Sequence, residues 1–348
     1  MSSPTIHTEL SFPFDAPPES GECIEVAEGV LWIRIPMPFV LDHINIFAIA
    51  DGDGWAIVDT GLETRGTATI WRDLLEGMLQ GKPITRVLVT HMHPDHVGMA
   101  GWLTRRFDCP LWMTRLEYLN CRVLVADTLR EAPKEAIRFC TAAGWNEDEI
   151  DDYRTKFGNF GKFIHPLPDS FKRIREGERF TIGAHEWTVV VGAGHSPEHA
   201  CFYCPDLKLF LSGDQVIPKI SSNISVYPIE PAANPMHGWL KSLVHVRDTV
   251  PDDVLVLPSH KTAFYGLHAR INALLDEHYT DFGKLKEALR TPKRVVDVFD
   301  SLFKVQILGT DLLNMATGEC VANLNYLENL GQVTRTTDEA GVDWFQRV

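Results

Sequence analysis

Hydrophobic residues in the first 265 positions follow two alternating patterns. Short runs rich in valine and isoleucine, several of them alternating with polar residues, are typical of strands. Between them lie segments with apolar residues three and four positions apart, such as residues 64–79 and 235–249, which predict helices. The expected strands are residues 22–26, 30–35, 44–50, 55–59, 87–89, 178–182, 186–191, 199–204, 207–212 and 254–257. Two groups of strands separated by helices predict an α/β fold in which two mixed sheets pack together.

An all-helical pattern interrupts this alternation at about residues 114–165. Helices are expected at residues 115–126, 133–143 and 147–157, and the last of them follows Asn146 with Glu149 three positions on, as in a helix start. A helical insertion of this kind either covers a site in the larger domain or decorates its outside. The sequence leaves both interpretations open.

The pattern changes again after residue 266. Helices are expected at residues 267–289, 291–303 and 317–330, followed by two strands at 331–336 and 342–348 around a turn. This order resembles a winged-helix module, which could form a dimer contact or close one edge of a site. We therefore expect a loose N-terminal arm at residues 1–21, a main domain at 22–265 and a C-terminal region at 266–348.

Composition narrows the class of protein. The 348 residues carry 33 basic and 47 acidic side chains, and the net charge of −14 disfavours a nucleic acid partner. Seven cysteines without framework spacing suit reduced thiols in the cytoplasm. The chain start lacks a secretory signal, and no run approaches the ~20 apolar residues that span a bilayer. We expect a cytoplasmic protein with a small-molecule substrate and no membrane partner, and a homodimer stays open.

Four metal-ligand side chains lie within six residues, directly after the predicted strand at 87–89. They are His91, His93, Asp95 and His96, and Pro94 between them ends the strand. In an extended segment His91, His93 and Asp95 would leave the same face, with His96 turned toward a second centre. Imidazole and carboxylate together suit zinc, manganese or iron. The alternative is a polar loop that is rich in histidine without a function.

This HxHxDH motif resembles the signature of the metallo-β-lactamase-fold hydrolases, in particular those similar to glyoxalase II and lactonases. Four further motifs follow the family's order, each an apolar run that ends in a turn with a ligand-type residue. They are AIVDTG at 56–61, GHSP at 194–197, LSGD at 211–214 and LPSH at 257–260. The resemblance implies a four-layer αββα sandwich, here with a helical insertion and a small winged-helix-like C-terminal region.

The resemblance also implies a dinuclear metal centre. His91, His93 and His195 would hold the first ion, Asp95, His96 and His260 the second, and Asp214 would bridge them. Two divalent cations, with zinc favoured over manganese or iron, would lower the pKa of a bridging water to give hydroxide near neutral pH. The implied activity is hydrolysis of an ester-like bond, in a thioester, a lactone or a related ester. Asp95 is the candidate proton shuttle.

Six further residues are assigned to the surroundings of this centre. Asp59 would accept a hydrogen bond from a ligand imidazole and so assist catalysis, and His199 would act as a hydrogen-bonded support. Asn223 and Tyr227 could contact a substrate carbonyl or its developing oxyanion, and Tyr227 is the candidate catalytic hydroxyl. Met37 and Phe39 could line an apolar entrance. Turn-forming or packing roles are the alternative for these last four residues.

Two other activities use the same fold and stay open. A nucleic-acid-processing nuclease would need a cationic surface, whereas residues 281–348 carry eight basic and ten acidic side chains. An iron-dependent redox enzyme, as among persulfide dioxygenases and flavodiiron proteins, is the third class. No flavodoxin-like domain follows, and the complete second set of ligands favours two metals.

Overall fold

The computed structural model describes residues 9–348, and the chain divides into two compact units. The first unit contains the chain up to Thr128 together with Asn159–Ser222 and Leu243–Ile271. The second contains Leu129–Gly158, Asn223–Ser242 and Asn272–Val348. The middle of the predicted insertion therefore groups with the C-terminal region. Within the described residues, no helix is both long enough and apolar enough to cross a membrane.

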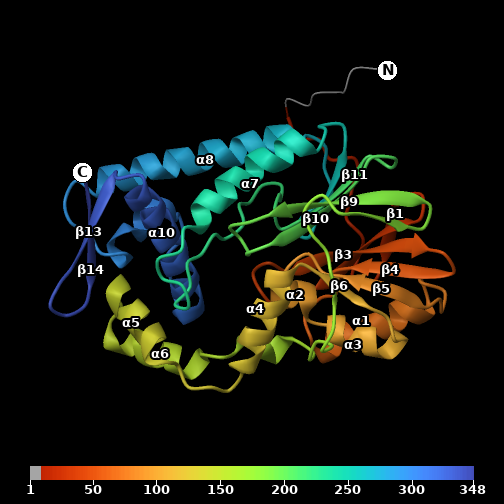
Figure 1. Ribbon diagram of the computed structural model, residues 1–348, viewed down its shortest axis with the longest axis horizontal. Helices are drawn as coiled ribbons and strands as arrows, with labels where there is room; N and C mark the ends of the chain where they lie inside the picture. The colour runs from red at the N-terminus through yellow and green to blue at the C-terminus, as the bar shows by residue number, and fades with distance from the viewer. Residues whose placement is uncertain (1–8) are drawn as a thin grey trace. The chain divides into compact units, whose positions relative to one another are not determined.

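The first unit contains a seven-stranded mixed sheet, whose first strands are red and orange in Figure 1. Its strands follow the order of the chain: β1 (Cys23–Ala27), β2 (Val30–Pro36), β3 (His43–Asp51), β4 (Gly54–Val58), β5 (Ile84–Leu88), β6 (Leu111–Met113) and β7 (Lys172–Arg173). Strands β1 to β4 pair antiparallel, and β4 to β7 pair parallel. The short strands β6 and β7 were not predicted from the sequence.

A second, five-stranded mixed sheet completes this unit. Its order is β12 (Leu255–Pro258), β11 (Leu209–Gly213), β10 (His199–Cys204), β9 (His185–Gly192) and β8 (Arg179–Ile182). Only β11 and β12 pair parallel. The prediction of two mixed sheets is confirmed.

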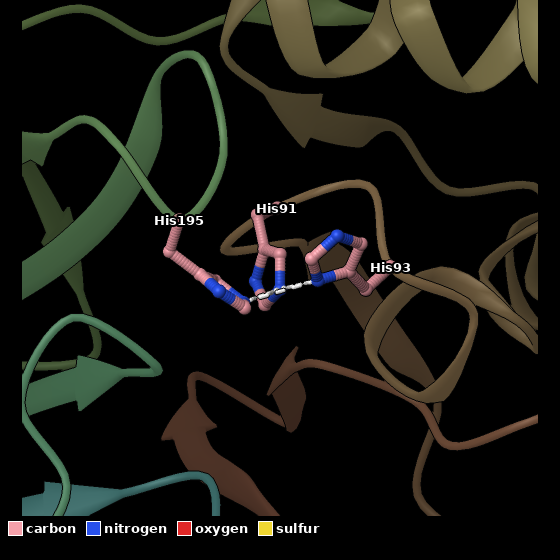
Figure 2. Close-up of side chains that lie close together, drawn as sticks. All are labelled: His91, His93 and His195. Atoms are coloured by element: carbon pink, nitrogen blue, oxygen red, sulfur yellow. Dashed lines mark hydrogen bonds between the residues drawn. The ribbon is translucent and has the colours of Figure 1, made fainter. Parts of the chain in front are cut away.

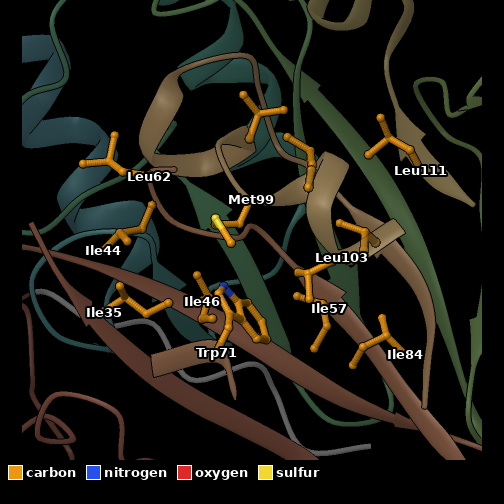
Figure 3. Packing of buried hydrophobic residues seen from close by; sticks show 14 of the residues in the cluster. Ile35, Ile44, Ile46, Ile57, Leu62, Trp71, Ile84, Met99, Leu103 and Leu111 are labelled. Atoms are coloured by element: carbon orange, nitrogen blue, oxygen red, sulfur yellow. The ribbon is translucent and has the colours of Figure 1, made fainter. Parts of the chain in front are cut away.

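Alternation along the strands of the first sheet places its apolar residues in two separate cores. In β2, Ile33 and Ile35 face the core that includes Trp71 of α1 (Arg65–Glu76) and Leu103 of α3 (Ala100–Phe107). Figure 3 shows this cluster, and Figure 1 shows α1 and α3 against the sheet. Val30 and Trp32, from the same strand, face the core shared with the second sheet. Both faces of the sheet are therefore buried, since successive side chains leave opposite sides.

Most of the remaining helices lie where the sequence pattern predicted them, but α2 and η1 were not predicted, and the C-terminal region needs corrections. They are α2 (Pro94–Val97), α4 (Arg115–Ala126), η1 (Phe160–Phe163), α5 (Lys134–Ala143), α6 (Glu147–Lys156), α7 (Pro235–Thr249), α8 (Leu267–Ala288), η2 (Val296–Val298), α9 (Phe299–Leu302) and α10 (Thr310–Asn329). The hairpin β13 (Val333–Thr337) and β14 (Asp343–Arg347) is where the two C-terminal strands were predicted.

The continuous helix predicted at residues 291–303 is wrong. Lys293 instead pairs with Phe345 of β14 through two backbone hydrogen bonds of 2.9 and 2.8 Å, and only the single turns η2 and α9 follow. Helix α10 begins at Thr310 rather than at residue 317, after Gly309 with φ of 79°. The predicted helix at 291–303 is absent because this segment pairs with a strand that is distant in the sequence. Local periodicity carries no information about such a contact.

The N-terminal arm was predicted to be loose. Residues 1–8 lie outside the described residues, but the rest of the arm is bound to the first unit. Ser11 pairs with Tyr265 through backbone hydrogen bonds of 3.1 and 2.9 Å, and the ring of Phe14 packs edge-on against Trp32 at 5.7 Å. This part of the prediction is wrong because an apolar side chain and a backbone pair hold the segment.

Candidate metal centre

The candidate ligands follow the carboxyl ends of strands in both sheets. His91 and His93 lie in the loop after β5, Asp214 comes directly after β11, and His260 is the second residue after β12. His195 lies in the connection between β9 and β10. Because parallel strands end at the same edge of a sheet, these loops reach one place although they are far apart in sequence.

Three imidazoles form the first group of ligand atoms (Figure 2). His93 Nδ1 lies 2.9 Å from His91 Nε2 and 3.0 Å from His195 Nε2, and the two Nε2 atoms are 3.2 Å apart. Nitrogens held tetrahedrally at about 2.0–2.1 Å from a zinc ion would lie about 3.3 Å apart. The spacing of the group is therefore close to that of a metal site.

The protonation of this group suits a cation. Burial, reinforced by the neighbouring imidazoles, lowers the pKa of His93 to about 3 and that of His91 well below its usual value. The Nδ1 atom of His91 lies 3.0 Å from the hydroxyl of Thr90, so the neutral ring directs the lone pair of Nε2 toward the group. Unprotonated nitrogens facing one another are the donor set that Zn²⁺ takes in proteins.

The second group combines two imidazoles with a carboxylate. Asp95 Oδ2 lies 3.3 Å from His260 Nε2 and 3.5 Å from His96 Nε2. Burial opposes a charge on His260, but the carboxylates of Asp214 and Asp95 outweigh it and raise the pKa of His260 to about 10. Carboxylates that draw a proton onto a buried imidazole mark a place where positive charge is stabilised.

Asp214 lies between the two groups. Its Oδ2 is 3.4 Å from His195 Nε2 and 3.6 Å from His96 Nε2, and its Oδ1 is 3.4 Å from His260 Nε2. Among the described side chains, Asp214 Oδ1 and His96 Nε2 are buried polar atoms without a hydrogen-bond partner. Buried polar atoms are rarely left unpaired, so these two fit residues that would bind cations.

Asp59 and Thr90 hold the rings of the first loop in place. Asp59 is buried, and its Oδ2 accepts hydrogen bonds of 2.8 Å from His96 Nδ1 and from the Thr90 hydroxyl. Its Oδ1 accepts the backbone N–H of Thr90 at 2.8 Å. The bond to Nδ1 leaves His96 Nε2 directed at Asp95 and Asp214, which is the arrangement predicted for Asp59. Thr90 was not singled out in the sequence, although it immediately precedes the motif.

Two further histidines make hydrogen bonds close to the candidate ligands. His260 Nδ1 donates to the carbonyl of His43 at 2.8 Å, and His43 Nε2 accepts the N–H of Lys261 at 2.8 Å. His199 Nε2 accepts the backbone N–H of Asp214 at 3.0 Å, and its ring stacks on His91. The hydrogen bond of His199 is of the supporting kind that was predicted. No special role was expected for His43.

The expectation that Asp95 shares a face with His91 and His93 is wrong. The strand β5 ends at Leu88, and α2 begins at Pro94 with His93 as its N-cap, so Asp95 lies in the first helical turn. Its carboxylate turns toward His96 and His260 instead. Proline at the first helical position favours this change of direction.

The residues predicted to contact substrate lie in different surroundings. Met37 is buried in the same core as Ile35, and Phe39 is half exposed with its ring edge-on to Phe163 at 6.1 Å. Asn223 and Tyr227 belong to the second unit. The substrate contacts of these four predicted residues stay predictions.

Comparisons with known proteins agree with the fold. Residues 40–260 match the Metallo-beta-lactamase superfamily, and residues 282–348 match the Metallo-beta-lactamase-like, C-terminal domain. The crystal structure of a Beta-lactamase domain protein from Burkholderia ambifaria has 35% identity and a TM-score of 0.89, over 97% of this chain and 98% of that one.

Several curated relatives are named for an activity. The probable metallo-hydrolase YybB of Bacillus subtilis is 37% identical over 187 residues, which are 53% of this chain and 64% of the relative. A hydroxyacylglutathione hydrolase of Bdellovibrio bacteriovorus is 24% identical over 133 residues, 38% of this chain and 35% of the relative. The chain therefore belongs to the metallo-beta-lactamase superfamily and is a metal-dependent hydrolase with a C-terminal domain of the metallo-beta-lactamase-like type.

Proposed function

We propose that the chain binds two divalent metal ions and hydrolyses an ester-like bond in a thioester, a lactone or a related ester. The observation that carries the proposal is the position of Asp214, whose carboxylate lies within 3.4–3.6 Å of imidazoles from both ligand groups. A carboxylate in this position fits two ions better than one. His91, His93 and His195 would hold the first ion, and Asp95, His96 and His260 the second.

The charges of the centre favour attack on a polarised carbonyl group. Two divalent ions would bring four positive charges, and the carboxylates of Asp95 and Asp214 offset two of them. Bound ions would lower the pKa of a water molecule and polarise a carbonyl oxygen. Zinc is the metal we propose, because the donor set consists of imidazole nitrogens and carboxylate oxygens.

Asp95 is the residue we assign to proton transfer. Its side chain is 20% exposed, against 9% for Asp214 and 2% for Asp59. A carboxylate must reach both the reacting atoms and solvent in order to move a proton between them. The oxygens of Asp59, in contrast, are occupied by His96 and Thr90, so Asp59 orients a ligand and transfers no proton.

A thioester is our first choice of substrate. The relative that supports it is named a hydroxyacylglutathione hydrolase, but its similarity covers only 38% of this chain. A thiolate leaves more easily than an amine, and sulfur is a good ligand for zinc. Lactones and oxygen esters present the same carbonyl carbon, so they belong to the same proposal.

The test is a substrate screen on one preparation with known metal content. Thioesters, lactones and phosphoesters are offered to the purified protein, to the chelated protein, and to chelated protein resupplied with zinc, manganese or iron. We expect about two metal ions per chain and hydrolysis of a carbonyl ester that disappears on chelation and returns with metal. Hydrolysis that persists after complete metal removal would refute the mechanism, and one iron per chain with redox activity would favour the alternative class.

A further inference from the structure

Among the described helices, two begin with the residue pattern of a capping box, but only one of these two forms it. The pattern places Ser, Thr or Asn at the N-cap and Glu three residues later. Helix α6 begins with Asn146 and Glu149, and α4 begins with Thr114 and Glu117. In α6 both reciprocal bonds are present, from Glu149 N to Asn146 at 2.9 Å and from Asn146 N to Glu149 at 2.8 Å.

In α4 the same two side chains turn away from their own helix. Thr114 makes no capping hydrogen bond, and its hydroxyl donates to the carbonyl of Glu198 at 2.7 Å. The carboxylate of Glu117 accepts two backbone N–H groups from elsewhere in the first unit. Residues that have the sequence pattern of a local motif but do not form it are often found at functional sites.

The two backbone groups bound by Glu117 belong to the loops that carry the first ligand group. Oε2 accepts the N–H of Met92 at 2.9 Å, and Met92 stands between His91 and His93. Oε1 accepts the N–H of Glu198 at 2.7 Å, in the loop that carries His195. One carboxylate therefore connects a loop of the first sheet with a loop of the second.

The connection is reinforced and buried. Glu198 returns a bond, since its Oε2 accepts the N–H of Leu116 at 2.8 Å. Glu117 itself is fully buried, with 0% exposure, and burial raises its pKa. A buried carboxylate is costly unless it is hydrogen-bonded, so its position is explained by the two loops that it joins.

We propose that Glu117 is a positioning residue for the first metal, because it fixes the separation between the His91–His93 loop and His195. The inference rests on the metal binding in the proposed function. Glu117 contacts no candidate ligand atom in the hydrogen bonds described, and it acts through the backbone on either side of the ligands. Residues that orient ligands in this way typically contribute 10- to 100-fold to metal affinity.

The main test variant is Glu117→Gln. Glutamine has the same shape, but its amide nitrogen is a donor and cannot accept a backbone N–H, so one of the two loops loses its bond. We expect zinc affinity at the first group to fall roughly 10- to 100-fold, measured by competition with a chromophoric chelator. Cobalt substitution should show a weakened first site while the second still fills. The expected kinetic effect is a lower kcat at limiting metal that excess zinc restores.

Glu149→Gln is the matched control. It makes the same chemical change at the same helical position, and glutamine is also found at this place in a capping box. We expect two metal ions per chain with unchanged affinity. Glu117→Asp is a second variant, which retains the charge but is one methylene shorter. Its carboxylate should reach only one loop, and the affinity for the first metal should fall by an intermediate amount. This variant tests the positioning role if Glu117→Gln does not fold.

The outcomes separate this inference from the proposed function. If the unmodified chain binds no metal, the proposed function fails first. If it binds two ions, and both Glu117 variants bind two with the same affinities, the positioning role is refuted. Equal losses at both sites, or an equal loss in Glu149→Gln, would mean that the variants act through general stability, which also refutes it.

Discussion

The carboxylate of Asp59 accepts a hydrogen bond of 2.8 Å from His96 Nδ1, and both side chains are buried. Asp59 adopts φ of 60°, a conformation that L-residues rarely take, immediately after β4. The contact directs His96 Nε2 toward the carboxylates of the second ligand group. Backbone strain at this position accompanies the orientation of a candidate ligand.

Replacement of this carboxylate should weaken the second metal. In Asp59→Asn the charge is lost, and the amide can present a donor to His96. We expect an affinity loss of roughly 10- to 100-fold at the second group, measured by metal competition. Asp53→Asn, in the exposed turn between β3 and β4, is the control and should bind normally. Equal metal affinities in the two variants would show that Asp59 does not contribute to metal binding.

Asp214→Asn should have a larger effect, because Asp214 approaches both groups. We expect fewer than two bound ions per chain and a fall in kcat of roughly a thousandfold, about 4 kcal/mol in the activation barrier. The measurement is elemental analysis together with kinetics on the ester found in the screen. Asp206→Asn, an exposed aspartate between β10 and β11, makes the same change of charge elsewhere. Full activity in Asp214→Asn would contradict the dinuclear site.

Metal removal should lower thermal stability. Ions that bind only the folded chain stabilise it by about 4 kcal/mol when free metal exceeds Kd a thousandfold. We expect the melting temperature to fall on chelation and to recover with zinc, as followed by calorimetry. If elemental analysis shows complete removal and the melting temperature does not change, the buried imidazoles and carboxylates are stable without ions.

A pH effect is expected in the second unit, away from the candidate ligands. Glu319 of α10 accepts a hydrogen bond of 2.7 Å from Asn223 Nδ2, and burial raises the pKa of its carboxyl to about 7. An acid with a raised pKa binds its proton more tightly in the folded state. Its stabilising contribution is therefore complete below the unfolded pKa of about 4.3 and is lost as the pH rises through about 7.

Glu319→Gln should remove this dependence. The difference in the free energy of unfolding between Glu319→Gln and the unmodified chain should shift in favour of the variant as the pH rises from 4 to 8, as denaturant titrations would measure. Glu339→Gln, at an exposed position in the turn of the C-terminal hairpin, should show no such shift. A constant difference across this range would show that Glu319 is not perturbed.

Much of the fold could be predicted because its strands alternate. The segment from Val30 to Ile35 sends Trp32 to one core and Ile33 to another, and this period of two is visible in the sequence. The two-residue strand β7 has too little sequence for any period. The helix predicted at 291–303 failed because Lys293 pairs with Phe345, a contact between distant residues.

The sequence by itself determined the candidate ligands, because their types and spacing form short motifs at strand ends that resemble a known family. Only the tertiary structure decided what holds them. Glu117 meets the backbone N–H groups of Met92 and Glu198, which are 25 and 81 positions away. In the sequence Thr114 and Glu117 have the spacing of a helix cap. The bonds they form instead depend on how two sheets bring their loops together, and no local pattern encodes that distance.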